Sequence, residues 1–165
     1  MFTRRTFTTQ GLATALAATT LGQRTAAAGE KTMTFEITKT DAEWKSLLTP
    51  EQFRVLRKHG TERAGTSPLD KTYDPGMYHC AGCDLPLYAS DTKYDSGTGW
   101  PSFWKPLDNA IGTSEDSSWF TVRTEVHCRR CGGHLGHVFE DGPKPTGLRY
   151  CMNGVAMKFV PKAGS

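Results

Sequence analysis

The first clear hydrophobic pattern in the chain lies at residues 41–48. Its apolar residues Trp44, Leu47 and Leu48 are spaced i, i+3 and i+4, as on one face of an α-helix. The segment is therefore predicted to be a short helix with one buried face.

A second helix is predicted to follow at once. Thr49 is a suitable N-cap, Pro50 fits the first helical position, and Gln52 stands three residues after the cap, as a capping box requires. Phe53 and Leu56 would form the buried stripe of this helix. The two segments together predict an antiparallel helix pair.

The ends of this helix pair are also marked in the sequence. Gly60 is expected to close the second helix, and His59 in its last turn is predicted to be a surface residue that compensates the helix dipole rather than a ligand. Before the pair, residues 29–40 are predicted to be a linker and lead-in. Phe35 and Ile37 alternate there with polar residues, together with Met33, as in a short edge strand.

From Gly65 onward the pattern changes to short segments separated by Gly, Pro, Asp and Ser, which is typical of strands and tight turns. The clearest strand is predicted at 119–127, and further strands are predicted at 135–139 and 155–160. In the first of these, the side chains expected on one face are Phe120, Val122, Thr124 and Val126, and those expected on the other are Thr121, Arg123, Glu125 and His127. In the last, Val155, Met157 and Phe159 are expected to alternate with Ala156 and Lys158. The body of the chain is thus predicted to be mainly β.

Length and charge narrow the class of protein. The 165 residues suit one domain with a real hydrophobic core, so disulfides are not needed as its main support. The chain has 20 Lys and Arg against 17 Asp and Glu, and Arg4, Arg5 and Arg24 stand within the acid-free residues 1–28. The remainder is formally neutral, which argues against a nucleic-acid binder or a polybasic membrane-surface protein.

The N-terminus resembles a twin-arginine export signal. Arg4 and Arg5 precede a mildly apolar stretch, residues 11–22, and small residues then end at Ala28, where cleavage is predicted. The stretch is too short and too polar for a membrane span, which needs about 20 apolar residues. A disordered tail and an uncleaved anchor are the alternatives. The prediction is an exported, periplasmic protein without stable membrane association after cleavage.

Five cysteines carry the strongest chemical signal. Two Cys-x-x-Cys turns separated by a long stretch have the spacing of a structural zinc site, which takes four thiolates. The predicted ligands are Cys80, Cys83, Cys128 and Cys131. Two disulfides or a redox-active pair are the alternatives. Since the signals that the N-terminus resembles carry folded proteins, zinc could be loaded before export.

Cys151 is the cysteine that remains. It begins a predicted strand close to Arg149, and a nearby guanidinium favours the thiolate that attacks an electrophile. Cys151 is therefore a candidate nucleophile. An inert buried cysteine is the alternative.

Two further groups of residues could surround a nucleophile. His134 and His137 follow the second Cys-x-x-Cys turn and could carry protons near neutral pH, although one could instead bind the metal, or both could cap the turn. Residues 96–104 form a Gly-rich segment with aromatic residues, Trp100 and Phe103 among them, which could line a ligand site or belong to the core.

The motifs in combination closely resemble the B-class methionine sulfoxide reductases, which reduce the R epimer of methionine sulfoxide. The resemblance covers about residues 41–161 and rests on four ordered motifs. They are the first Cys-x-x-Cys, Ser-Gly-x-Gly-Trp-Pro-Ser-Phe at 96–103, Cys-x-x-Cys-Gly-x-His-Leu-Gly-His-Val-Phe at 128–139, and Gly-x-Arg-Tyr-Cys-x-Asn at 147–153.

The resemblance implies a mainly β fold of two antiparallel sheets, forming a compact β-barrel-like core, with a short N-terminal helix pair and one structural zinc held by the four paired cysteines. It implies that the thiolate of Cys151 attacks the sulfoxide sulfur and becomes a sulfenic acid. His134 and His137 are then the acid candidates, and Asn153 orients the polar end of the substrate. The implied substrate-binding residues are Trp100, Phe103, Arg149 and Asp141, the last two as supporting charges.

The chain departs from the family pattern at two positions. Thr98 stands where many members carry a resolving cysteine, and Gly154 stands where a Ser is common. With four thiols on zinc, the sulfenic acid should be reduced by an external thiol, either a thioredoxin-like protein or a small thiol.

The domain prediction is a signal peptide at 1–28, a linker at 29–40, the reductase domain at 41–161 and a tail at 162–165. The predicted partners are oxidised methionine in proteins or peptides and the thiol reductant, with the protein itself a monomer. Two functions of other classes stay open, a zinc-ribbon-like binding module and a thiol-disulfide oxidoreductase.

Overall fold

The structure is a computed structural model that describes residues 34–117 and 121–164. All of these residues belong to one compact unit that runs from Met33 to Ser165. The predicted export signal lies outside the described residues. Among the residues that are described, no helix has the length and apolar character needed to cross a membrane.

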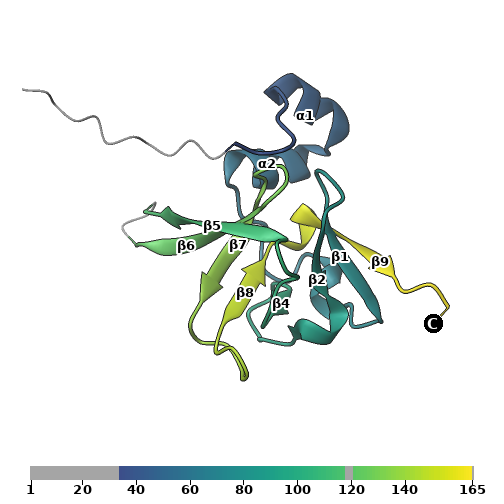
Figure 1. Ribbon diagram of the computed structural model, residues 1–165, viewed down its shortest axis with the longest axis vertical. Helices are drawn as coiled ribbons and strands as arrows, with labels where there is room; N and C mark the ends of the chain where they lie inside the picture. The colour runs from purple at the N-terminus through teal and green to yellow at the C-terminus, as the bar shows by residue number, and fades with distance from the viewer. Residues whose placement is uncertain (1–33, 118–120, 165) are drawn as a thin grey trace, which may run out of the picture. The chain divides into compact units, whose positions relative to one another are not determined.

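Two antiparallel sheets form the body of the protein (Figure 1). The smaller sheet has the order β2-β1-β9, with bounds β1 (Gly76–Cys80), β2 (Pro86–Ala89) and β9 (Met157–Pro161). The larger has the order β3-β4-β8-β7-β6-β5, with bounds β3 (Lys93–Tyr94), β4 (Ser102–Phe103), β5 (Ile111–Asp116), β6 (Arg123–Cys128), β7 (His134–Phe139) and β8 (Arg149–Met152). The predicted class, mainly β with two antiparallel sheets, is confirmed.

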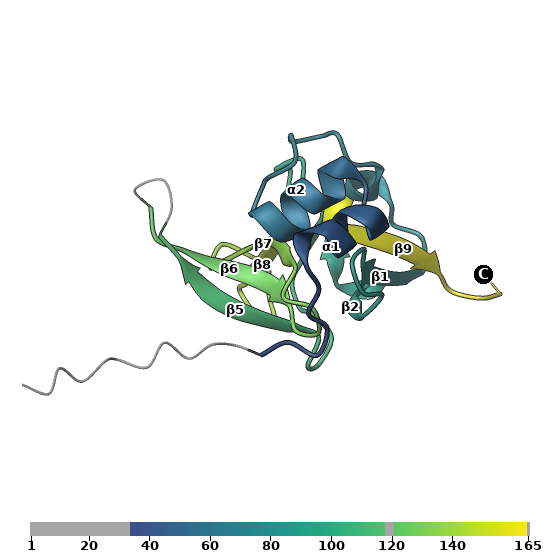
Figure 2. The ribbon, with the colours of Figure 1, turned by 90° about the horizontal axis from the view of Figure 1, so that it is seen from above.

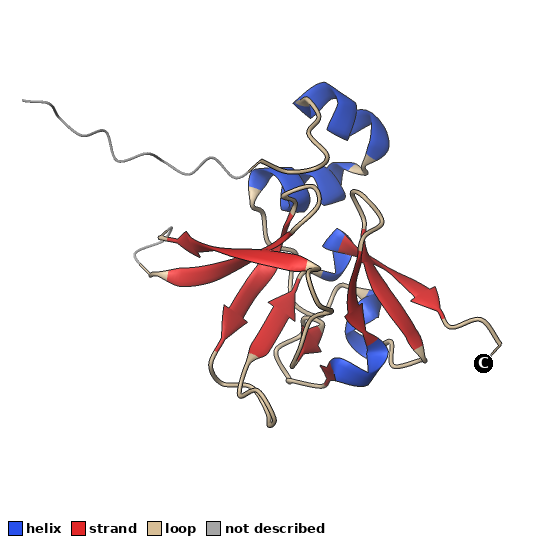
Figure 3. Ribbon diagram, viewed as in Figure 1, coloured by secondary structure: helices blue, strands red, loops and turns tan. Residues whose placement is uncertain are grey.

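The predicted helix pair is also confirmed, and both helices lie on the same side of the strands (Figure 3). Each of α1 (Asp41–Leu47) and α2 (Pro50–Lys58) begins with a complete capping box, from Thr40 and Thr49 respectively. Such a box satisfies two backbone N–H groups that a helix start would otherwise leave unpaired. Because these caps are local, they could be read from the sequence.

The end of α2 differs from the prediction. His59, and not Gly60, adopts the left-handed conformation that ends the helix, with φ 52°. The lead-in also differs, since the described residues 34–40 form no strand. One backbone bond of 3.0 Å, from the N–H of Ile37 to the carbonyl of Arg130, holds this segment. A strand needs a ladder of backbone hydrogen bonds, and this single bond does not provide one. Phe35 and Ile37 therefore alternate with polar residues in the sequence without forming a strand.

The predicted strand at 119–127 begins later and is buried differently. β6 starts at Arg123, residues 118–120 lie outside the described ones, and Val122 is 69% exposed. Glu125 and His127 are buried, as is Val126 between them. Buried and exposed residues alternate along a strand only where one face of the sheet is exposed to solvent. This end of β6 is therefore covered on both faces, and the polar residues Glu125 and His127 are buried along with Val126.

The remaining strand predictions agree more closely. β7 covers the predicted 135–139, and β9 begins two residues inside the predicted 155–160 because a 3₁₀ turn, η4 (Gly154–Ala156), comes first. Among the described residues, a 3₁₀ turn η1 (Pro68–Lys71) lies between α2 and β1, and another, η2 (Ser90–Thr92), connects β2 to β3. The hydrophobic core draws side chains from the helices and from both sheets, including Trp44, Leu56, Tyr78, Leu87, Phe103, Val126, Leu135 and Met152.

β7 and β8 approach each other closely at Gly136. A Cβ atom built there would lie 2.1 Å from the carbonyl oxygen of Cys151 and 3.0 Å from Cα of Met152. Both contacts are to backbone, which cannot turn aside as a flexible side chain can. The strand that carries Cys151 therefore depends on the missing side chain of Gly136.

We expect Gly136→Ala to destabilise the protein by about 3 kcal/mol, because an overpacked site must shift its backbone. Urea unfolding followed by circular dichroism would measure the loss. Gly82→Ala is a matched control, since its Cβ would meet no heavy atom closer than 3.6 Å. Equal stability of the two variants would contradict the proposed close approach.

Candidate active site and metal centre

The two Cys-x-x-Cys turns fold in the same way. In each, the residue after the second cysteine donates its backbone N–H to the carbonyl of the first at 2.9 Å, Asp84 to Cys80 and Gly132 to Cys128. Both donors have positive φ, 62° and 66°. This turn directs two thiols to one side of the chain, so each turn offers half of a four-sulfur site.

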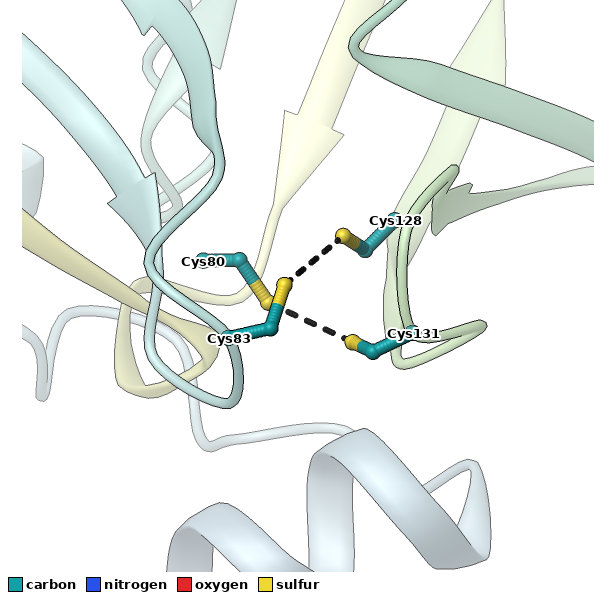
Figure 4. Close-up of side chains that lie close together, drawn as sticks. All are labelled: Cys80, Cys83, Cys128 and Cys131. Atoms are coloured by element: carbon teal, nitrogen blue, oxygen red, sulfur yellow. Dashed lines mark hydrogen bonds between the residues drawn. The ribbon is translucent and has the colours of Figure 1, made fainter. Parts of the chain in front are cut away.

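The four sulfur atoms converge (Figure 4). All lie within 4.8 Å of one another, and two contacts join the two turns, with 3.8 Å between the sulfurs of Cys80 and Cys131 and 3.5 Å between those of Cys83 and Cys128. All five cysteines are free of disulfides. These contacts join the two turns into one four-sulfur cluster, which does not favour Cys80 and Cys83 as a separate redox pair.

The cluster fits a structural zinc site. A tetrahedral zinc with Zn–S bonds of about 2.3 Å separates its sulfurs by about 3.8 Å, close to the spacing found here. Three of the four cysteines are buried, and Arg57 donates to the carbonyl of Cys131 at 2.9 Å. One turn follows β1 and the other follows β6, so an ion here would join the smaller sheet to the larger one.

Cys83→Ser should remove the metal and lower the free energy of unfolding by about 4 kcal/mol, the linkage energy of a ligand at 1,000 times its Kd. Elemental analysis and thermal unfolding would measure both effects. Cys151→Ser is the matched control and should keep one zinc per chain. A Cys83→Ser protein with full zinc content and unchanged stability would contradict the assignment.

Register in the larger sheet brings a row of polar residues together across its strands. Glu125 in β6 pairs with His137 in β7, His137 pairs with Cys151 in β8, and Cys151 pairs with Ser102 in β4. Directly paired residues place their side chains on the same face of a sheet, with Cβ atoms about 5 Å apart. The sheet thus sets an imidazole beside the thiol although 14 residues separate them in the chain.

The Cys151 thiol is held between hydrogen-bonding groups and apolar surroundings. The hydroxyl oxygen of Thr98 lies 3.9 Å from its sulfur. Burial raises the pKa of Cys151 above its ordinary value, and Thr98, Arg149 and Ser102 oppose this shift. The predicted effect of the guanidinium is present, but burial outweighs it. The thiolate therefore depends on these opposing groups.

His137 contacts a carboxylate at the edge of the same site. Its Nε2 lies 2.7 Å from Asp116, and Arg123 donates to the same carboxylate at 2.8 Å. Burial lowers the pKa of His137 below its ordinary value, although the bond to Asp116 opposes the shift. A largely neutral imidazole beside a thiol can accept the thiol proton and return it later.

His134 lies deeper. It is 2% exposed, its Nδ1 is 2.7 Å from Glu125, and its ring stands 5.3 Å from that of His137. Its Nε2 is buried with no hydrogen-bond partner among the described residues. His134 does not line the cavity beside Cys151, so it can influence the site only through its ring contact with His137.

A cavity of about 170 Å³ opens beside the thiol. Its lining includes Trp100 and Phe139 as apolar surfaces, and His137, Cys151 and Asn153 as polar groups. A void of about 150 Å³ can hold a benzene ring. The cavity is therefore of a size for one side chain, with a thiol, an imidazole and an indole around it.

Asn153 is placed at this cavity, but its amide is already bonded. Its side-chain oxygen accepts from the N–H of Glu62 at 2.9 Å, and its NH₂ group donates to the carbonyl of Leu135 at 3.0 Å. Glu62 also accepts the indole N–H of Trp100 on its carbonyl at 3.1 Å. Asn153 and Glu62 together fix the cavity wall, so Asn153 is better placed to position other groups than to bind a ligand itself.

The other predicted substrate-binding residues lie outside the cavity lining. Arg149 forms a double hydrogen bond of 2.8 Å with Asp141, and its guanidinium lies 4.4 Å from the ring centroid of Phe139. Phe103 is fully buried and stacks on Tyr88 at 4.3 Å. The structure thus places Phe103 in the core and the Arg149–Asp141 pair behind the cavity wall.

Sequence reasoning missed several residues of the site. They are Thr61, Glu62, Asp116, Arg123, Glu125 and Phe139. Arg123 and Glu125 did stand in a predicted strand, but the alternation of that strand did not indicate that they lie at the site. Glu62 and Asp116 belong to no local motif, and only pairing across the chain brings them here.

The arrangement is that of a thiol-dependent enzyme with a structural metal centre, since one free thiol faces a small cavity while four others form a separate cluster. Residues 48–161 match the SelR domain. The chain is 56% identical over 128 residues to a peptide methionine sulfoxide reductase MsrB of Leptospira interrogans, covering 77% of this chain and 98% of the relative. It is 54% identical over 127 residues to an MsrB of Agrobacterium fabrum, covering 76% and 94%. The chain belongs to the SelR family.

Arg149→Met should raise the pKa of Cys151 further, because the guanidinium favours the thiolate. The rate of alkylation by iodoacetamide follows the thiolate, so its midpoint should move to higher pH. Lys105→Met is a control that removes an exposed cation elsewhere. An unchanged or acid-shifted midpoint in Arg149→Met would show that Arg149 does not stabilise the thiolate.

Proposed function

We propose that the protein reduces the R epimer of methionine sulfoxide, in proteins or peptides, to methionine. The observation that carries the proposal is the cavity of about 170 Å³, in which Cys151 lies between the indole of Trp100 and the imidazole of His137. Membership of the SelR family supports the same activity.

Selectivity for one epimer follows from the two unlike sides of the cavity. A sulfoxide sulfur is pyramidal, so exchanging epimers exchanges the positions of methyl and oxygen. With the methyl against Trp100, the oxygen of the preferred epimer faces His137. In the other epimer the oxygen would lie against the indole, and leaving a polar group unpaired costs about 1–3 kcal/mol, with a similar loss for the misplaced methyl.

The chemical step uses groups that the chain itself supplies. The thiolate of Cys151 attacks the sulfoxide sulfur, the S–O bond breaks, and methionine leaves as the oxygen is transferred to the cysteine sulfur. The proton lost by the thiol ends on that oxygen, by way of His137, so that Cys151 becomes a sulfenic acid. His137 therefore serves as base and then as acid, and Asp116 orients its ring.

Regeneration requires an external thiol. Thr98 occupies the position next to Cys151, and the other four cysteines belong to the metal cluster. One thiol of the reductant would attack the sulfenic acid, displace water and form a mixed disulfide with Cys151. A second thiol would attack this mixed disulfide, which regenerates the Cys151 thiol and leaves the reductant as a disulfide. A thioredoxin-like protein or a small thiol fits this role. A monomer suffices, because the described site is built from one chain.

We expect mature protein with dithiothreitol to reduce the R epimer of a methionine sulfoxide peptide at least about 100-fold faster than the S epimer. Cys151→Ser should abolish turnover while keeping zinc and fold. Chiral chromatography of the remaining sulfoxide measures both. If neither epimer is consumed by folded, zinc-loaded protein, the reductase proposal fails and a non-catalytic zinc-binding module is favoured.

We also propose that the protein is exported through a twin-arginine signal at residues 1–28, cleaved after Ala28 and active in the periplasm. The paired Arg4 and Arg5 and the small residues before Gly29 support this. Fractionation of cells expressing the full chain and an Arg4→Lys/Arg5→Lys variant would test it. Equal periplasmic amounts of both would contradict twin-arginine export.

A further inference from the structure

A second cluster of metal-binding groups lies outside the four-cysteine centre. His59 at the end of α2, Glu125 in β6 and His134 in β7 each offer one ligand atom, and these atoms lie within 4.8 Å of one another. α2 lies against the end of β7, as two views show (Figures 1 and 2). The cluster thus forms only because the helix pair covers this part of the larger sheet.

One carboxylate oxygen joins the two imidazoles. Oε1 of Glu125 lies 3.0 Å from Nδ1 of His59 and 2.7 Å from Nδ1 of His134. A tetrahedral ion with bonds of about 2.0–2.1 Å separates its ligand atoms by about 3.3 Å. The His59 distance therefore needs to lengthen by about 0.3 Å and the His134 distance by about 0.6 Å. The side chain of His59, 66% exposed, has the freedom to make its part of that adjustment.

The donor set suits a divalent transition-metal ion. Two imidazoles and one carboxylate are ligands that Zn²⁺ takes in sites that keep a fourth position open. Ser114 donates to the other oxygen of Glu125 at 2.5 Å, so the carboxylate is held in place from behind. Burial raises the pKa of Glu125, but hydrogen bonds from His134, His59 and Ser114 bring it well below its ordinary value. The carboxylate is thus ionised, as a ligand must be.

The fourth position would face a cavity of about 700 Å³. All three cluster residues line this cavity, together with Glu115, Asp116 and Arg123. Arg123 pairs with Asp116, so Glu115 is the carboxylate that favours cation entry, and the opening leaves room for water on the ion. The cavity adjoins the one of about 170 Å³ that Cys151 lines, because Thr61 and Arg123 line both. The ring of His134 in the first lies 5.3 Å from that of His137 in the second.

We propose that His59, Glu125 and His134 form a second metal site, which binds a divalent transition-metal ion such as Zn²⁺ or Co²⁺ with one coordination position open to the cavity.

Titration of the zinc-loaded mature protein with Co²⁺ tests the proposal. One further equivalent should bind and give visible d–d absorption without the thiolate charge-transfer band of a sulfur-bound cobalt. His59→Ala should weaken this binding by at least about tenfold, since even groups that only support a ligand contribute that much. Zinc content of the four-cysteine centre should stay at one per chain in both proteins.

Glu115→Gln is the matched control, because it removes a carboxylate of the same cavity that is not part of the cluster. It should retain the spectrum and most of the affinity. No second equivalent in the native sequence, equal affinity in His59→Ala, or loss in Glu115→Gln equal to that in His59→Ala would overturn the proposal. The first outcome would leave the cluster as a hydrogen-bonded triad.

One consequence rests on the proposed function. An ion on Nδ1 of His134 would replace its bond to Glu125 and disturb His137, which contacts it. Co²⁺ should therefore slow the single turnover of reduced enzyme, measured as methionine formed without any external thiol. His59→Ala should be insensitive to the ion. Equal inhibition of both proteins would overturn this link but leave the metal titration to decide the site itself.

Discussion

The convergence of four thiols is the constraint on which the rest of the structure depends. Each Cys-x-x-Cys turn belongs to a different sheet, and sulfur contacts of 3.5 and 3.8 Å join the two turns. Four thiols at this spacing are poorly satisfied as neutral groups but complete a tetrahedral zinc shell. The cluster therefore fixes where β6 ends and β7 begins. His134 stands only three residues beyond Cys131, so the four-cysteine cluster also sets the start of the strand that carries both histidines.

The larger sheet, which one of these turns joins, places the reactive side chains next to one another. Its register aligns Glu125, His137 and Cys151 on one face, and the close approach at Gly136 holds β8 against β7. A thiol and an imidazole placed on neighbouring strands need little rearrangement to exchange a proton, which is the advantage of a site built on rigid elements. The cavity wall is fixed in a similar way, through the backbone of Glu62, which bonds both Trp100 and Asn153.

Burial and charge oppose each other throughout this region. Burial alone raises the pKa of Cys151 and lowers that of His137, which disfavours the charged form of each. Arg149 and Thr98 moderate the first effect and Asp116 the second. Around Glu125 the balance is reversed, because three hydrogen bonds outweigh burial and keep a carboxylate ionised inside the protein. Burial thus favours the protonated thiol of Cys151, whereas Thr98 and Arg149 favour its thiolate.

The sequence by itself determined the features that depend on local spacing. The capping boxes at Thr40 and Thr49 are closed within four residues, two Cys-x-x-Cys turns present paired thiols, and Cys151 is left over by counting. The mainly β class followed from short segments between turn residues. Tertiary structure alone decided which residues meet. Phe103 lies in the core, His59 is exposed as predicted but contacts Glu125, and Glu125 and His127 in β6 are buried. Such outcomes depend on register and on helix placement, which join residues far apart in the chain and leave no periodic mark in it.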